Sequence, residues 1–184
     1  MLWLWILLAI AVLVIIIFFS YYNRFVNLSN RIDNSLSQID VQLKRRADLI
    51  PNLVESVKGY MKHEKAAIKS VTDARKALVS AKDIPSRVKA NDQLEGFLGK
   101  LFALAENYPD LKANTNFLQL QNELTSTEDK VAYSRQFYND SILSYNNLTK
   151  MFPGLFFARL YGFKEKEYLK ITEAERKAVK VEFE

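Results

Sequence analysis

The first part of the chain is an unbroken apolar run, in which every residue from Leu2 to Phe19 is apolar. About 20 apolar residues cross the hydrocarbon core of a bilayer as one helix. Tryptophans lie near one end of the run and tyrosines follow the other end, as in the aromatic belts of membrane spans. We therefore predict a transmembrane anchor over residues 1–23, with the lipid bilayer as its partner.

A cleaved signal peptide is the alternative interpretation of this run. It requires a cationic start, a shorter apolar region and small residues at the cleavage point. Here the first charge is Arg24, and the run ends in Phe-Phe-Ser-Tyr-Tyr, so the anchor is favoured. The cationic flank of a span stays in the cytoplasm. We expect a single-pass protein of the cell membrane, with its N-terminus outside and residues 24–184 inside.

A seven-residue apolar repeat begins at Phe25 and predicts a long helix that buries one stripe. Its two seam positions hold thirteen apolar or aromatic residues among sixteen, where a 49% hydrophobic composition would give about half. The stripe is wide, which suits a bundle better than an isolated two-stranded coiled coil. This helix is predicted over about 24–82, with a possible bend at Gly59.

Further apolar periodicity predicts three more helices, over about 86–106, 114–150 and 155–161. Pro109 lies in the loop between the first two of these, because the residue before a proline is driven towards an extended conformation. Pro153 follows the end of the long one. The fold class is therefore all-α, with an anchor followed by an antiparallel bundle of three long helices and a short C-terminal helix, similar to a four-helix bundle.

The chain from Lys164 onward is rich in charges and is expected to be a tail. Its last apolar residues alternate with charges, which is typical of an extended segment, here one that could dock on a helix groove. These residues are Val179, Val181 and Phe183.

Pro51 lies within the first predicted helix of the bundle. A proline inside a helix costs about 3 kcal/mol and leaves the carbonyl four residues earlier, that of Ala47, without its amide partner. The apolar repeat keeps its phase across Pro51, which favours a kink in a continuous helix. The alternative is a true break, with Pro51 as the first residue of a new helix.

Arg46 and Glu64 are charged residues at seam positions of the repeat. The plain interpretation is that both lie at the edge of the stripe and reach water, since long side chains snorkel. The sharper hypothesis is that they pair with polar residues of the helix over 114–150, because buried polar pairs can fix register in a bundle. The candidate partners are Glu128, Arg135, Asn139 and Asn146.

Signatures of enzymatic chemistry are scarce. Cysteine is absent and His63 is the only histidine, which excludes a thiolate site and a histidine cluster. Four acidic residues, Glu64, Glu123, Glu128 and Asp129, lack the Glu-x-x-His pairs of a di-metal bundle. The net charge of +5 is modest, and no dense basic face suggests nucleic acid. We expect no cofactor, no metal, no nucleic acid and no small-molecule substrate.

The aromatic stretch Phe152 to Phe163, which includes Phe156 and Phe157, is the best candidate for a functional surface. One interpretation is that it caps the bundle. The other is that it is a membrane-surface or partner-binding element, since exposed apolar patches mark such sites.

Several motifs together resemble the LemA family. They are the run Arg-x-Asp-Leu-Ile-Pro-Asn-Leu over Arg46 to Leu53, the segments YPDLKANTNFLQLQNEL and FPGLFFARLYGF, and the paired steps Tyr138-Asn139 and Tyr145-Asn146. The resemblance covers nearly the whole chain. It implies a bacterial protein with a helical bundle behind one N-terminal transmembrane helix and an extracellular N-terminus. It brings no catalytic residue or cofactor.

The function expected from these features is a non-enzymatic scaffold or adaptor at the inner face of the cell membrane, in contact with other membrane proteins. The alternative is a homo-oligomeric protein that organises the membrane by binding copies of itself. An enzyme is a third and much weaker alternative, since the search for catalytic motifs finds none.

Overall fold

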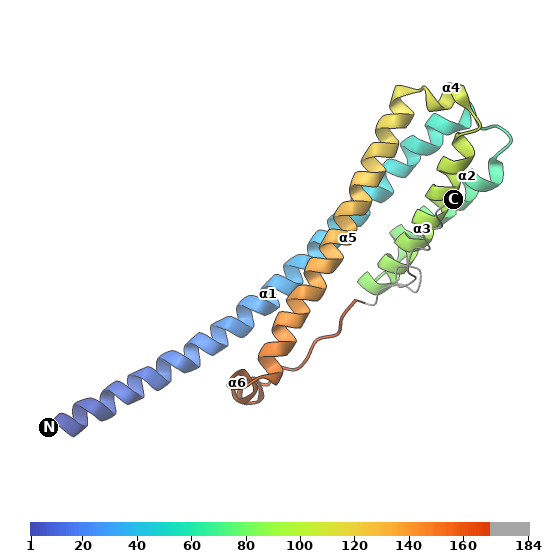
Figure 1. Ribbon diagram of the computed structural model, residues 1–184. Helices are drawn as coiled ribbons and strands as arrows, with labels where there is room; N and C mark the ends of the chain where they lie inside the picture. Colours follow the sequence, from blue (N-terminus) through green and yellow to red (C-terminus); the bar gives the residue numbers. More distant parts are fainter. Residues whose placement is uncertain (170–184) are drawn as a thin grey trace, which may run out of the picture. The chain divides into compact units, whose positions relative to one another are not determined.

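The structure, a computed structural model, describes residues 1–169. In that range every regular element is a helix: α1 (Leu2–Lys58), α2 (Lys65–Ser80), α3 (Ile84–Ala105), α4 (Pro109–Lys112), α5 (Thr115–Lys150) and α6 (Gly154–Tyr161) (Figure 1). The all-α class is therefore confirmed. The chain forms two compact units: unit 1 holds residues 1–28 and the chain from Tyr138 onward, and unit 2 holds residues 29–137. Helices α1 and α5 contribute to both.

The prediction of one helix over 24–82 is wrong, because the chain turns after Lys58 and begins α2 at Lys65. The amides of Tyr60 and Met61 both donate to the carbonyl of Val57, at 3.1 and 2.8 Å. The Met61 bond has the usual helical spacing of four residues, whereas the Tyr60 bond spans three and tightens the chain directly after Gly59, where the absence of a side chain makes helix least favourable. The apolar repeat does not reveal the turn, because Val71, Ala74 and Leu78 of α2 are buried at the positions that the repeat predicts. Within the turn the repeat fails, since the seam residue Tyr60 is 42% exposed and Met61 is buried instead.

Unit 2 is a bundle of the second part of α1, α2, α3 and the first part of α5. Short connections join its successive helices, and α2 packs along α3. Helix α4 is a single turn where the sequence predicted a loop, and it buries Leu111. The start of α3 is capped by Asp83, whose carboxylate accepts the amide of Ser86 at 2.9 Å. The largest fully buried apolar side chains of this unit are Ile32, Ile39, Leu43, Ile50, Leu53, Met61, Leu94, Leu101, Leu111 and Leu124.

Helix α1 continues through Pro51 without a break, so the alternative of a new helix starting there is wrong. The carbonyl of Ala47, which the proline leaves without an amide partner, accepts a hydrogen bond from Nε of Arg75 on α2 at 2.8 Å. A side chain of the neighbouring helix thus satisfies the backbone group that the proline exposes.

Unit 1 combines the N-terminal part of α1, the end of α5, α6 and the segment 163–169. Gly154, the first residue of α6, packs against the end of α5 so closely that a Cβ there would meet the carbonyl of Leu148. Gly162 ends α6 in the left-handed conformation, with φ of 76°. It directs the chain into the non-helical segment that follows. The extended segment predicted at Val179 to Phe183 lies outside the described residues.

Candidate functional site

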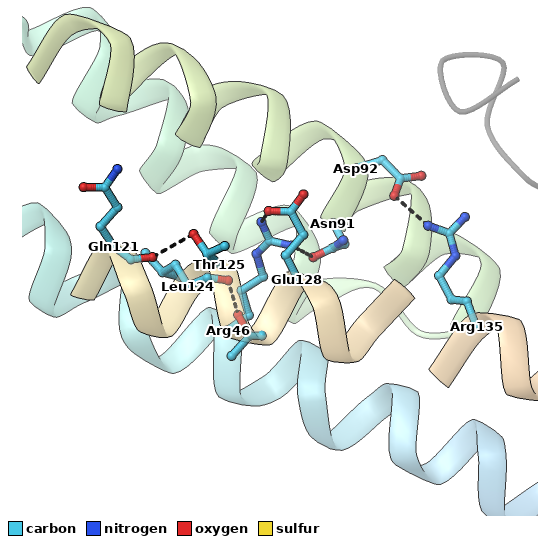
Figure 2. A network of polar contacts seen from close by, with 9 residues as sticks. Arg46, Asn91, Asp92, Gln121, Leu124, Thr125, Glu128 and Arg135 are labelled. Carbon is cyan, nitrogen blue, oxygen red and sulfur yellow. Dashed lines mark hydrogen bonds and ion pairs between the residues drawn. The ribbon is translucent and has the colours of Figure 1, made fainter. Parts of the chain in front are cut away.

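Arg46 lies at the centre of a charged cluster in unit 2, formed with Asn91, Glu95 and Glu128. Figure 2 shows Arg46 with Asn91 and Glu128. Its side chain is only 1% exposed. Nη1 donates to Oδ1 of Asn91 on α3 at 3.2 Å, and Nη2 lies 3.6 Å from Oε2 of Glu128 on α5. One guanidinium from α1 thus holds α3 and α5 together, since its planar fork offers donors in two directions.

Beside Arg46, two carboxyl groups face each other across α3 and α5. Burial and a hydrogen bond to the Glu128 carboxyl raise the pKa of Glu95 to about 7. Both the burial and the neighbouring acidic group disfavour the charged form of Glu95. Burial also lowers the pKa of Arg46, although the neighbouring acidic groups partly offset this by raising it. On the same two helices, Arg135 of α5 lies 3.4 Å from Asp92 of α3.

The sharper hypothesis for Arg46 agrees with the structure, and its interpretation as a solvated edge residue is wrong. Glu128 was among the partners that the sequence suggested. Glu64 behaves differently: it is half-buried before α2 and accepts a hydrogen bond from the phenol of Tyr108 at 3.2 Å. That partner lies at the start of α4 and could not be read from the apolar repeat.

In unit 1, Asn139 and Asn146 of α5 form an amide clamp on the segment after α6. Asn146 donates from Nδ2 to the carbonyl of Lys166 and accepts the Lys166 amide at Oδ1, both at 2.9 Å. Asn139 makes the same pair of bonds to Leu169, at 3.2 and 3.0 Å. Each side-chain amide therefore pairs with a backbone as a neighbouring strand would.

The spacing of the amide clamp explains why two asparagines seven residues apart are needed. Seven helical residues rise about 10.5 Å, and the three residue steps from Lys166 to Leu169 span about 10 Å when extended. The two lengths match, so the segment runs along α5 in register. The Tyr-Asn repeat in the sequence indicated a special site. The sequence does not reveal that the segment bound there is the start of the charged tail of the same chain.

The tyrosines of the repeated steps support the same segment. Tyr138 is buried and donates from its hydroxyl to the carbonyl of Glu167 at 3.3 Å. Tyr145 is buried against the edge of Phe25, with ring centroids 5.9 Å apart. The Lys166 ammonium lies 5.3 Å from the Tyr145 ring centre. Burial raises the pKa of the Tyr145 phenol.

The aromatic stretch after α5 contains both buried and exposed residues, so part of it caps the helices and part of it is available for contact with a membrane or a partner. Phe157 is buried and stacks on Tyr21 of α1, with ring centroids 4.4 Å apart, so it caps this unit. Phe152 and Phe156 are 88% and 56% exposed. Those two belong to a free apolar surface.

The described residues contain no group of three or more His, Asp or Glu side chains placed to hold a metal ion. In that same part of the chain, α1 is the one helix that is long and apolar enough to cross a membrane. An apolar helix of this kind that continues into a helical bundle defines a class of protein with one candidate membrane span.

The chain belongs to the LemA family, whose profile matches residues 35–183. It is 30% identical to Protein LemA of Metamycoplasma hominis over 126 residues, which are 68% of this chain and 58% of the relative. It is 27% identical to Magnetosome protein MamQ of Magnetospirillum gryphiswaldense over 173 residues, with 80% of this chain and 64% of the relative covered. Magnetosome protein MamQ 2 of Paramagnetospirillum magneticum matches to the same extent. The chain thus spans less than two thirds of the length of these relatives.

Proposed function

We propose that this protein is a membrane-anchored, non-enzymatic scaffold or adaptor whose bundle lies at the inner face of the cell membrane. The observation that carries the proposal is the continuity of α1. Its apolar residues are almost all exposed from Leu2 to Phe19, and from Phe25 onward the same helix buries a regular stripe. The candidate span and the stripe-burying helix are therefore parts of one unbroken element, Leu2–Lys58.

The side-chain chemistry of the described residues supports a binding role rather than catalysis. His63 is exposed after α1, and the charged cluster around Arg46 is engaged in joining helices. Buried polar pairs of this kind serve register and specificity of packing.

The orientation can be tested with single cysteines, because the chain has none of its own. A membrane-impermeant maleimide is applied to intact cells that carry Tyr133→Cys, an exposed position on α5, or Trp3→Cys. We expect Trp3→Cys to react in intact cells and Tyr133→Cys to react only after the membrane is opened. The reverse pattern would place the bundle outside and overturn the inner-face assignment.

The adaptor role is tested by mild crosslinking in native membranes, followed by affinity isolation of the full chain and sizing. A second protein at fixed stoichiometry, crosslinked to the bundle, is the expected result. A single large species made only of this chain would instead favour the homo-oligomeric alternative. Turnover of a small molecule that one polar substitution abolishes would overturn the non-enzymatic role.

A further inference from the structure

Helix α6 presents two apolar faces, and only one of them is covered. Gly154, Phe157 and Ala158 are buried. Phe156 and Leu160 are exposed on the other side, one helical turn apart, and Phe152 precedes them at the same spacing. Neighbouring exposed apolar side chains, in contrast to single ones, mark sites of contact with a membrane or a partner.

The place where α6 is attached indicates what covers the exposed face. The hydroxyl of Tyr161 donates to the carbonyl of Phe18 at 2.9 Å. The Phe157 ring stacks on Tyr21 and lies edge-on to Phe18, with centroids 5.2 Å apart. Both contacts fall where the apolar run of α1 ends, so α6 is fixed at the level where a spanning α1 leaves the hydrocarbon core. Tyrosine favours that border, because its ring is apolar and its hydroxyl is polar.

A groove of about 500 Å³ joins the span to α6. Its walls are apolar and aromatic side chains: four come from the last turns of the apolar run, one is a tyrosine that follows the run, and one comes from α6. They are Val14, Ile15, Phe18, Phe19, Tyr22 and Tyr161. A groove that is continuous with the surface of a membrane span and lacks polar walls suits an acyl chain.

The charges around this surface suit a lipid headgroup region. Arg24 follows the span, Arg159 projects from α6, and Lys164 follows α6; all three are exposed. An amphipathic element with apolar residues on one side and cations beside them binds at the boundary of headgroups and acyl chains. Juxtamembrane cations strengthen such binding when the leaflet is anionic.

We propose that α6 and the turn before it form a second membrane contact, in which Phe152, Phe156 and Leu160 insert into the leaflet that α1 leaves. A phospholipid acyl chain occupies the groove between α1 and Tyr161. This inference rests on the proposed anchoring of α1. Two attached elements at one leaflet would fix the tilt and rotation of α1, which a single span does not do alone.

The test uses the full chain in vesicles of phosphatidylcholine and phosphatidylglycerol, with an environment-sensitive fluorophore on single cysteines. Phe156→Cys reports on α6. Tyr168→Cys is the matched control, because Tyr168 is an aromatic residue of the same unit and is 47% exposed. Ile10→Cys reports on insertion of the span. Quenching is measured with lipids brominated on the acyl chain and with iodide in the water.

We expect the label at position 156 to lose most of its emission to brominated lipid and little to iodide, while the label at 168 shows the opposite. Quenching at 156 by iodide alone would place α6 in water and overturn the proposal. Protection at 156 from both quenchers would mean that protein covers this face, which also overturns it. If the label at position 10 is not quenched by brominated lipid, the anchoring itself fails, and this outcome is distinct from the others.

A second variant separates insertion from attachment. Phe152→Ser, Phe156→Ser and Leu160→Ser are combined, with the label moved to Arg159→Cys on the same helix. The contacts of Phe157 and Tyr161 with α1 remain, so the fold is expected to persist, as far-ultraviolet circular dichroism would verify. Quenching by brominated lipid should be lost at 159 and kept at 10. Unchanged quenching at 159 would overturn the role of the exposed face.

Discussion

The two units join α1 to α5 by different chemistry. In unit 2 the joint is ionic, since Arg46 of α1 is buried beside Glu128 of α5. In unit 1 it is aromatic, since Phe25 of α1 packs on Tyr145 of α5 and stacks on Phe163, with centroids 4.7 Å apart in the second pair. The stability that a buried ion pair contributes depends on one partner and on its charge state. The stability that aromatic packing contributes is nearly independent of pH and of any single partner. The same pair of helices is therefore joined by a buried ion pair in one region and by aromatic packing in the other.

The largest expected effect comes from removing the centre of the charged cluster. Arg46→Ala should lower the free energy of unfolding by about 3 kcal/mol, the low end for breaking a buried ion pair. The low end applies because Glu128 is 42% exposed and can regain water. Urea unfolding in detergent micelles measures the change. Arg45→Ala, at the exposed neighbouring position, should be nearly neutral, and equal losses in the two variants would contradict a special role for Arg46.

A smaller effect is expected in unit 1, where the amide clamp is cut. Asn146→Ala removes two hydrogen bonds to the backbone of Lys166, which should cost about 1–2 kcal/mol. Hydrogen exchange of the Lys166 amide should accelerate. Asn146→Asp keeps the acceptor and loses the donor. The exchange rate of its Lys166 amide should therefore lie between those of the unchanged protein and Asn146→Ala. Asn147→Ala, on the exposed side of α5, is the control, and exchange that is equally fast in this variant would contradict the clamp.

Pro51 and Arg75 should be energetically coupled within unit 2. Arg75→Met leaves the Ala47 carbonyl without its hydrogen bond and should cost about 1 kcal/mol. In a Pro51→Ala background, the restored backbone amide can serve that carbonyl, and the same substitution should cost much less. A double-mutant cycle isolates this coupling. An equal cost of Arg75→Met in both backgrounds would show that the bond does not compensate for the proline.

The pH dependence of stability distinguishes the ionic joint from the aromatic one. With its pKa raised from 4.5 to about 7, Glu95 binds a proton in the folded state that it releases on unfolding between those values. The contribution of Glu95 to the free energy of unfolding should therefore be fully present below about pH 4.5 and should decline as pH rises to about 7. Glu95→Gln, which resembles the protonated acid, should flatten that decline in a series of thermal melts. The Glu106→Gln control, beyond the end of α3, should retain it; an unchanged slope in Glu95→Gln would contradict the pair.

The sequence alone is enough to predict the apolar span, the helical class and the positions of most buried residues. It could do so because these depend on apolar periodicity, which is a local property of the chain. It also singled out Arg46, because a charge at a seam position violates the pattern. The Tyr-Asn repeat was likewise visible, although its purpose was not.

Three features could not be predicted without the three-dimensional structure. They are the turn after Lys58, the bond from Arg75 to the Ala47 carbonyl, and the segment that Asn139 and Asn146 hold. Each joins residues far apart along the chain or ends a helix whose apolar phase continues beyond it. Periodicity gives which face of a helix is buried but not what lies against it. The two faces of α6 show the same limit, since Phe156 and Phe157 are adjacent in sequence and identical in chemistry, and only their packing separates a core residue from an exposed one.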